Sequence, residues 1–310
     1  MSKVIVGIHG LANKPPKAKL EEWWRKSLDE GLEKNCGMVG ADYDYVMVHW
    51  ADLLYKHPVH FDKAMDFDQL YSDEPYRAAK PGALKAYDEG WLDAARAKAQ
   101  ALGGKALDVL KDKFEIDAFA NWLLEKTLKD LAFYYDKKRR LRDRDGKLRE
   151  ARKVLMDELA NVLGPLAGEE LLVIAHSMGS IIAYDVLRDL GRKKNPMAVA
   201  EFVTIGSPLG LPHVKGNIYE ERKSYAGKDA VRTPTIVTGR WTNFADRRDP
   251  VAFDTHLRDD FKANKAGVRV TDDLVLNDYL GAKGEHNYHK SYGYLRTPEL
   301  SKLVAGFLGG

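Results

Sequence analysis

Short runs of apolar residues alternate along the chain with longer segments in which apolar residues recur every three to four positions. Short apolar runs are typical of strands buried on both faces, and the longer spacing is typical of amphipathic helices. The predicted strands are residues 4–8, 43–50, 171–175, 199–205 and 235–238, and a further alternation at Val268 and Val270 predicts the last one. Because strand, helix and strand follow one another, the pattern predicts a parallel sheet with helical crossovers.

Four amphipathic helices are predicted around this sheet. The first begins after Pro15 and Pro16, and the second is stopped by Gly164 and Pro165. The third covers residues 180–190, and a closing helix covers residues 298–307. The apolar positions of the first two are Leu20, Trp23, Trp24, Leu28 and Leu32, then Leu148, Ala151, Val154, Leu155, Leu159, Val162 and Leu163.

The strand pattern is missing between residues 51 and 152, where helical sequence rich in Ala, Leu, Lys and Asp replaces it. A structureless loop of about a hundred residues is improbable inside a domain. We therefore expect an α/β core made of residues 1–50 and 153–310, with residues 51–152 inserted as a helical cap or lid. The aromatic residues of the insertion would line an acyl-chain pocket or, more often, pack helices together.

The run LLVIAHSMGSII, residues 171–182, changes from strand to helix within a few residues. Ser177 lies at that change, where so abrupt a reversal requires a strained backbone. Ala175 and Gly179, two positions before and after Ser177, are small enough to let strand and helix approach closely. This small-x-Ser-x-Gly pattern is that of a nucleophile elbow, with Ala175 at the position where glycine is commonest.

A serine hydroxyl is a weak nucleophile, so a site at Ser177 requires a base and an acid that orients the base. In hydrolases with this elbow, the acid and then the histidine follow the serine along the chain. Asp249, in an Asp-Pro-Val turn beyond a predicted strand, is the preferred acid, and Asp246 is the reserve. The alternative is that Asp249 only shapes the turn, or that Asp246 pairs with Arg247 or Arg248.

The histidine is expected in the stretch GEHNYHKSY, residues 284–292, between the last predicted strand and the closing helix. His289 is the preferred base because a His-x-Ser-Tyr sequence begins there, and His286 is the reserve. The alternative is a metal site formed by His286, His289 and His256 with Asp249 or Asp254. No HExxH motif or comparable ligand spacing is present, so no metal is expected.

Two backbone amides are the expected donors to an oxyanion at this site. Met178 directly follows the nucleophile at the start of a helix, where the helix dipole assists. Leu11 follows His9 and Gly10 at the end of the first strand and is the expected second donor. Both donors belong to the main chain, so side-chain substitution would test them poorly.

Three separated segments resemble the α/β-hydrolase superfamily, of the serine esterase and lipase kind: HGL at residues 9–11, AHSMG at 175–179, and DPV at 249–251 with a later histidine. The Gly-Ser-Pro turn at residues 206–208 also resembles lipase-like hydrolases. The resemblance implies a mostly parallel sheet flanked by helices, action on an ester or related acyl bond, and no cofactor. The chain departs from the family at Ala175, and it begins at the strand before the His-Gly turn, without two antiparallel strands that often precede it.

The composition is that of a globular protein, with 45% hydrophobic and 31% charged residues. A formal net charge of +3 is too small to require nucleic acid or an anionic membrane as the partner. The single cysteine, Cys36, excludes an internal disulfide and a cysteine-rich zinc site. No run approaches the roughly 20 apolar residues of a membrane-spanning helix, and the N-terminal residues lack a signal peptide, so we expect a cytoplasmic protein.

Lys and Arg residues cluster between residues 137 and 152, on sequence that we expect to be helical. A solvated helix face is the ordinary interpretation of such a cluster. The alternative is attraction of an anionic substrate or a membrane surface, so peripheral contact with lipid stays open.

These features predict a serine hydrolase that cleaves a carboxylic ester, or a related acyl bond, in a small molecule through Ser177, His289 and Asp249 and an acyl-enzyme intermediate. The same intermediate attacked by an alcohol or thiol would make the protein an acyltransferase. The second alternative is a non-catalytic binding or regulatory protein on the hydrolase fold. Such a protein would have no physical reason to keep all three residues in this order.

Overall fold

The computed structural model describes residues 2–57, 75–80, 127, 129–193, 196–226 and 231–309. Six strands form one sheet in the order β2-β1-β5-β6-β7-β8, and every neighbouring pair is parallel. The strands are β1 (Lys3–Ile8), β2 (Asp44–Val48), β5 (Glu170–His176), β6 (Val199–Ile205), β7 (Val237–Ala245) and β8 (Val270–Leu274). The predicted α/β class with a parallel sheet is confirmed.

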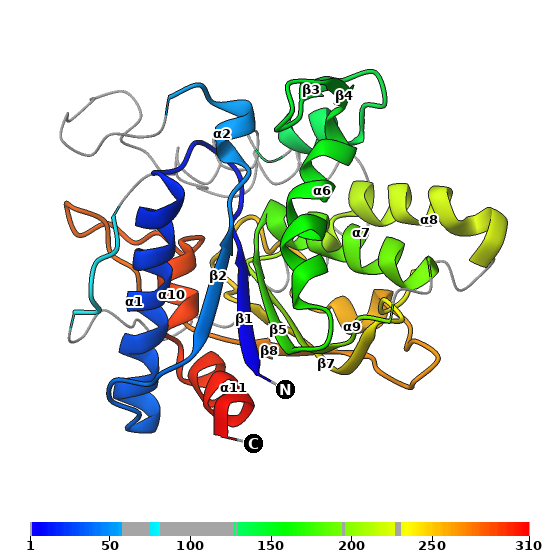
Figure 1. Cartoon of the computed structure of the whole chain (residues 1–310). Helices are drawn as coiled ribbons and strands as arrows, with labels where there is room; N and C mark the ends of the chain where they lie inside the picture. Colours follow the sequence, from blue (N-terminus) through cyan, green and yellow to red (C-terminus); the bar gives the residue numbers. More distant parts are fainter. Residues whose placement is uncertain are drawn as a thin grey trace, which may run out of the picture.

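Helices cover both faces of the sheet (Figure 1). One face carries α1 (Lys17–Cys36), α10 (Ser291–Leu295) and α11 (Pro298–Gly309), and the other carries α6 (Ala151–Leu163), α7 (Met178–Arg192) and α8 (Pro212–Ala226). Shorter pieces are α2 (Ala51–Leu54), α9 (Leu257–Asp260) and the 3₁₀ turns Gly164–Leu166 and Pro208–Gly210. Because all six strands run the same way, their carboxyl ends meet at one edge, where open α/β sheets bind ligands.

The strand β7 is longer than its apolar pattern predicts, because it continues through polar residues as far as Ala245. Two of these polar residues have partners on the neighbouring strand. The Arg240 guanidinium lies 2.8 Å from the Glu201 carboxylate, and the Asn243 side-chain carbonyl accepts a hydrogen bond from the Thr204 hydroxyl (2.9 Å). Arg240 lies in the exposed first half of β7, whereas Asn243 is buried. A buried polar side chain that is paired in this way is compatible with a strand, although it interrupts the hydrophobic pattern.

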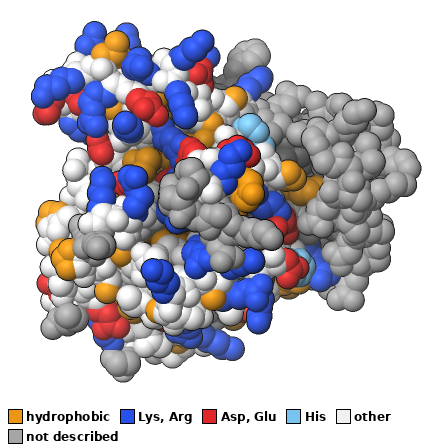
Figure 2. Space-filling model, turned by 90° about the vertical axis from the view of Figure 1, so that its right-hand side faces the viewer, with side chains coloured by type: hydrophobic (Ala, Val, Ile, Leu, Met, Phe, Trp, Pro, Cys, Tyr) orange, Lys and Arg blue, Asp and Glu red, His pale blue; other side chains and the backbone are white. Residues whose placement is uncertain are grey.

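The basic cluster that we expected on a helix forms a hairpin instead. Strands β3 (Arg140–Arg142) and β4 (Leu148–Glu150) pair antiparallel, and α6 begins only at Ala151. The Asp143 carboxylate accepts from the backbone N–H groups of Asp145 and Lys147, and Gly146 has a φ of +78°. These are turn residues that the helical interpretation overlooked. Figure 2, in which the hairpin lies at the top, shows Lys and Arg side chains gathered over this end of the molecule.

Most of the predicted cap lies outside the described residues. Within residues 51–152 the structure describes α2, residues 75–80, the helical residues 129–135 and the β3–β4 hairpin. None of the helices in these described ranges, or elsewhere in the described chain, has the length and apolar character needed to cross a membrane.

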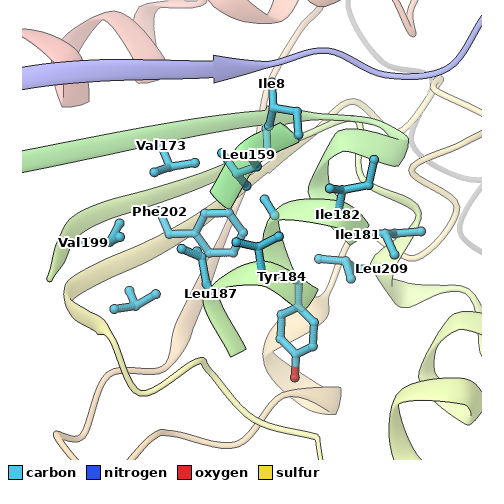
Figure 3. Packing of buried hydrophobic residues seen from close by; sticks show 14 of the residues in the cluster. Ile8, Leu159, Val173, Ile181, Ile182, Tyr184, Leu187, Val199, Phe202 and Leu209 are labelled. Carbon is cyan, nitrogen blue, oxygen red and sulfur yellow. The ribbon is translucent and has the colours of Figure 1, made fainter. Parts of the chain in front are cut away.

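Two buried apolar clusters hold the layers together, one on each face of the sheet. Along β1, Val4, Val6 and Ile8 contribute to the cluster under α6 and α7, whereas Ile5 contributes to the cluster under α1 and α11. Figure 3 shows the first cluster, in which Phe202 of β6 packs with side chains of α6 and α7. Because alternate residues of a strand point to opposite faces, apolar residues at successive positions are needed to fill both clusters.

A buried ionic network joins α6, α7 and α8. Asp185 of α7 is fully buried and accepts hydrogen bonds from the Tyr134 hydroxyl (2.9 Å) and from Arg152 Nη2 (2.6 Å). Arg188 Nη2 lies 3.2 Å from the other Asp185 oxygen, and Glu221 of α8 pairs with both arginines. The charges compensate one another, which is the condition for tolerating them inside a protein.

Replacement of Asp185 by alanine should lower the free energy of unfolding by about 3 kcal/mol or more, because Arg152 and Arg188 would lose their central carboxylate while staying buried. Asp189→Ala, four residues and thus about one turn further along α7, is the matched control. It removes a carboxylate that is partly exposed and should cost less than about 1 kcal/mol. Urea unfolding measures both changes, and a loss for Asp185→Ala no greater than that for Asp189→Ala would contradict this role of the network.

Candidate functional site

Ser177 occupies the turn between β5 and α7 with a left-handed backbone, φ 52° and ψ −129°. A positive φ is strained for a residue that has a Cβ, so neighbouring elements must hold it. The Ser177 N–H donates to the carbonyl of Ile205 at the end of β6 (3.1 Å). On the other side Gly179 packs against the end of β1, because a Cβ there would lie 2.6 Å from the His9 carbonyl oxygen. Both neighbouring strands therefore fix the turn.

Three of the predicted site residues come together from the ends of different strands. His289 Nε2 lies 3.0 Å from Ser177 Oγ, and His289 Nδ1 lies 2.8 Å and 3.0 Å from the two carboxylate oxygens of Asp249. An imidazole that donates from Nδ1 to a carboxylate leaves Nε2 free to accept a proton. The arrangement can therefore take the proton of the Ser177 hydroxyl and hold the resulting imidazolium against a negative charge.

The Asp249 carboxylate is fully buried and its oxygens are occupied. Oδ1 accepts from the Val251 backbone N–H (2.8 Å), and Oδ2 accepts from the Tyr294 hydroxyl (2.8 Å). Burial, followed by the nearby Asp249, raises the pKa of Tyr294 well above its ordinary value, so the phenol remains a donor. Gly206 leaves the room for this arrangement, because its φ is +54° and a Cβ would lie 2.8 Å from Asp249 Oδ2 and 3.2 Å from His289 Nδ1.

The two reserve residues lie elsewhere. Asp246 is bound by the Arg248 side chain, with Nη2 2.6 Å from Oδ2, and by the backbone N–H of Asn277 (2.7 Å). Asp246 pairs with Arg248, as the alternative interpretation stated, but its carboxylate is buried and not in solvent. The His286 ring stacks on Tyr288, with the ring centroids 5.1 Å apart. Within the described chain, neither residue contacts Ser177.

His176, the residue before the serine, braces the loop that carries His289. Its Nε2 lies 2.8 Å from the His289 carbonyl oxygen, so this nitrogen must carry a proton and donate it. The two rings lie 4.7 Å apart between centroids. Burial, followed by the nearby His289, holds the pKa of His176 well below its ordinary value. His176 is therefore a neutral donor that positions the main chain at His289.

His9 orients the peptide unit beside Ser177. The Trp50 backbone N–H donates to His9 Nε2 (3.1 Å), so the proton of the neutral ring is on Nδ1, which donates to the Gly10 carbonyl oxygen (2.7 Å). In a trans peptide the C=O and N–H bonds point in opposite directions, so the Leu11 N–H points away from His9. Gly10 lies against the serine, because a Cβ there would lie 3.2 Å from Ser177 Oγ.

Lys14 holds the following part of the same loop. Its Nζ is hydrogen-bonded to the Leu11 carbonyl and lies 3.3 Å from the carbonyl oxygens of Ala12 and Asn13. Ala12 has a φ of +70°, a strained value for an alanine. Burial, followed by the positive charge of Lys14, holds the pKa of His9 well below its ordinary value. His9 therefore stays neutral, which is the state that its two hydrogen bonds require.

The other predicted donor, the Met178 backbone amide, opens the 15-residue helix α7. The first N–H groups of a helix have no partner within the helix, and the helix dipole adds positive potential at this end. Ser177 Oγ therefore lies beside a positive helix terminus. A negative charge that forms there would be stabilised.

The metal alternative finds no support in the described part of the chain, where no group of three or more His, Cys, Asp or Glu residues is placed to hold a metal ion. Asp254, one of its proposed ligands, lies 3.3 Å from the ammonium group of Lys215. His256 Nδ1 lies 3.0 Å from the hydroxyl of Thr255.

Sequence reasoning missed Tyr294 and His176, and it missed Lys14 of the loop after β1. Tyr294 lies five positions after His289, but no local pattern marks a tyrosine as the partner of a distant carboxylate. His176 occupies a variable position of the elbow motif, where the residue type carries no information by itself. The one signal in the sequence was closeness along the chain: His176 directly precedes Ser177, and Tyr294 follows His289 by five residues.

No protein-family model matches this sequence, and no curated protein matches it. The interpretation of the site therefore rests on its geometry.

The two buried neutral histidines should make stability depend on pH. An imidazole of the unfolded chain binds its proton near pH 6.5, as is usual, whereas the lowered pKa values of His9 and His176 oppose protonation of the folded protein. Below about pH 6.5 the unfolded chain therefore binds more protons than the folded one. Stability is complete above that pH and falls as the pH decreases, by up to about 1.4 kcal/mol per pH unit for each histidine.

The variant His176→Gln tests this dependence, because it removes one of the two proton-binding sites. The free energy of unfolding, measured in urea between pH 7.5 and 5, should fall less steeply for the variant by about 1.4 kcal/mol per pH unit below pH 6.5. His213→Gln changes the same residue type at an exposed position and serves as the comparison. Equal slopes for wild type and His176→Gln would contradict the prediction.

Proposed function

We propose that this protein is a serine hydrolase of the α/β-hydrolase type that cleaves a carboxylic ester, or a related acyl bond, in a small molecule. The observation that carries the proposal is the hydrogen-bonded series from Ser177 Oγ through His289 to the Asp249 carboxylate. The order of these residues along the chain, Ser then Asp then His, is that of this superfamily. The strained turn at Ser177 between a central parallel strand and a helix adds support.

In the proposed acylation step, Ser177 Oγ attacks the carbonyl carbon of the ester while His289 Nε2 takes the hydroxyl proton. Asp249 holds the imidazolium in place through Nδ1–H. The former carbonyl oxygen, now negatively charged, accepts hydrogen bonds from the backbone amides of Leu11 and Met178. When the C–O bond of the ester breaks, His289 gives its proton to the leaving alkoxide, and an alcohol departs from the acyl-enzyme.

Deacylation repeats the same steps with a new nucleophile. A water molecule gives its proton to His289 Nε2 and attacks the acyl-enzyme, and the proton then returns to Ser177 Oγ as the acid leaves. An alcohol or thiol in the place of water would give acyl transfer. Product analysis with and without an added alcohol separates the two outcomes.

The non-catalytic alternative is disfavoured by how completely the three residues are connected. A carboxylate buried between a tyrosine hydroxyl and a histidine ring costs stability unless it is fully hydrogen-bonded. A binding protein would gain nothing from keeping Asp249, His289 and Ser177 connected by hydrogen bonds. The lid function of residues 51–152 stays a prediction alongside this proposal.

A fluorophosphonate probe tests the proposed nucleophile directly, because it modifies serines that a neighbouring base activates. Native protein should be labelled, whereas Ser177→Ala and His289→Ala should not be. The matched control is His286→Ala, which removes the reserve histidine and should leave labelling intact. Labelling of Ser177→Ala as strong as that of the native protein would refute the proposed nucleophile.

The two carboxylates of the loop after β7 should have separable effects. Asp249→Asn should lower kcat for p-nitrophenyl acetate by about 10⁴-fold, because the amide favours the wrong tautomer of His289. Asp246→Asn should mainly lower the free energy of unfolding, since Asp246 holds Arg248 and the loop. Equal losses of kcat in the two variants would contradict the assignment of Asp249.

The orientation of the Gly10–Leu11 peptide should contribute to turnover. His9→Phe keeps the ring but removes the hydrogen bond to the Gly10 carbonyl, so kcat should fall by about tenfold to a hundredfold while KM changes little. The loss of a whole oxyanion donor, about 10² to 10³ in kcat, sets the upper limit. His49→Phe is the control, because His49 contacts His9 at 5.2 Å between ring centroids but hydrogen-bonds to Pro15. A wild-type kcat for His9→Phe would show that His9 has no such role.

A further inference from the structure

The β3–β4 hairpin and the residues before it carry cations of two kinds. Some have carboxylate partners: Arg139 pairs with Asp136, Arg144 with Asp52 and Glu158, and Arg149 with Asp157. The others make no ion pair with any residue that the structure describes, and all are exposed: Lys137, Lys138, Arg140, Arg142 and Lys147. In this second group, Arg140 and Arg142 donate only to carbonyls of the hairpin backbone.

The register of the hairpin places Arg140 and Arg142 of the second group on one face. Arg142 is paired with Leu148, and residues directly opposite in an antiparallel pair point to the same side. Arg140 lies two residues from Arg142 and therefore shares that side. Leu141, between them, points to the opposite side and packs against the buried cluster under α6 and α7. The outer face thus combines Arg140 and Arg142 with Leu148, which is 62% exposed, and with Glu150, which lies opposite Arg140.

The hairpin is attached firmly to the end of the molecule that carries Ser177. Arg144 lies in the turn of the hairpin. It donates to the carbonyl of His49, which directly follows β2, and to the carboxylates of Asp52 and Glu158. His49 lies at the carboxyl end of the parallel strands, the same edge as Ser177 at the end of β5. Figure 1 shows the hairpin above that edge, and Figure 2 shows the Lys and Arg side chains around it.

We propose that this outer face, with Arg140, Arg142 and Leu148, together with the exposed Lys137, Lys138 and Lys147 beside it, binds the surface of a bilayer that contains anionic phospholipids. Residues 137–147 hold seven Lys or Arg and two Asp, a net charge of +5, whereas the whole chain carries +3, so positive charge is concentrated at this hairpin. Basic residues near an anionic lipid surface add to its attraction, and the exposed leucine between them can enter the interface.

Docking through this face would give the protein a defined orientation on the bilayer. Because the hairpin lies at the carboxyl edge of the sheet, a protein docked through it would hold Ser177 on the side nearer to the lipid. The docking proposal does not depend on the proposed hydrolase activity, since binding can be measured on protein whose Ser177 is replaced.

The experiment is co-sedimentation of the full chain with vesicles of phosphatidylcholine alone or with about one third phosphatidylglycerol, at two salt concentrations. Native protein should sediment with the anionic vesicles at low salt and be released at high salt, where the Debye length shortens. Arg140→Glu combined with Arg142→Glu should weaken binding by at least about tenfold. Lys137→Glu combined with Lys138→Glu, which lies outside the β-ladder, should do the same if the hairpin variant folds poorly.

The matched control is Lys265→Glu combined with Lys302→Glu, an equal change of charge at exposed residues, one just before β8 and one on α11, at the opposite end of the sheet. It should retain most of the binding. Leu148→Ser should weaken vesicle binding without affecting binding to a soluble polyanion. Failure of native protein to sediment with anionic vesicles, equal sedimentation with neutral vesicles, or equal weakening by the control would overturn the proposal. Binding to a DNA fragment but not to vesicles would also overturn it.

Discussion

The left-handed backbone at Ser177 is the constraint on which the rest of the site depends. Such a conformation costs about 1–3 kcal/mol and persists only where the surroundings enforce it. Here the enforcement comes from both neighbours of β5 in the sheet: the Ile205 carbonyl of β6 accepts the Ser177 N–H, and Gly179 packs on the end of β1. The register of three parallel strands therefore fixes where the serine oxygen lies. The loops after β7 and β8 only have to bring Asp249 and His289 to that point.

Three buried histidines near Ser177 have different tasks because their hydrogen-bond partners differ. His9 and His176 each donate to a backbone carbonyl, and the lowered pKa values of both keep them neutral. Of these three, only His289 donates to a carboxylate, which fixes the ring with Nε2 toward Ser177 Oγ. One residue type thus positions two main-chain segments and provides one base. The partner of each ring, and not its exposure, decides which task it has.

The sequence predicted the central strands well, and it named three residues, Ser177, Asp249 and His289, that the structure brings together. Residues 171–175 are buried on both faces, so an unbroken apolar run marked them, whereas Glu201 and Thr204 interrupt the apolar residues of 199–205. The Ser-Asp-His order restricted the partners of Ser177 to two short stretches. The hydrophobic pattern failed to predict strand residues that are buried but polar. The end of β7 contains Asn243, whose neighbour Thr204 becomes visible only when the strands pair. Tyr294 was missed for the same reason, because a hydrogen bond across 45 residues leaves no local trace.

In the β3–β4 hairpin, the sequence showed the residue types but not their arrangement. The cations of the hairpin were evident in the sequence, but the common face of Arg140 and Arg142 was not, because a helix and a two-stranded ladder distribute the same residues differently. Leu141 is the residue that decides the matter: its contact with the buried cluster turns Arg140 and Arg142 outward. The packing of an apolar residue therefore decides which way the neighbouring arginine side chains point, although the arginines are not part of the core. Substitutions on the outer face can change what this end of the molecule attracts while the sheet and the Ser177 turn stay intact.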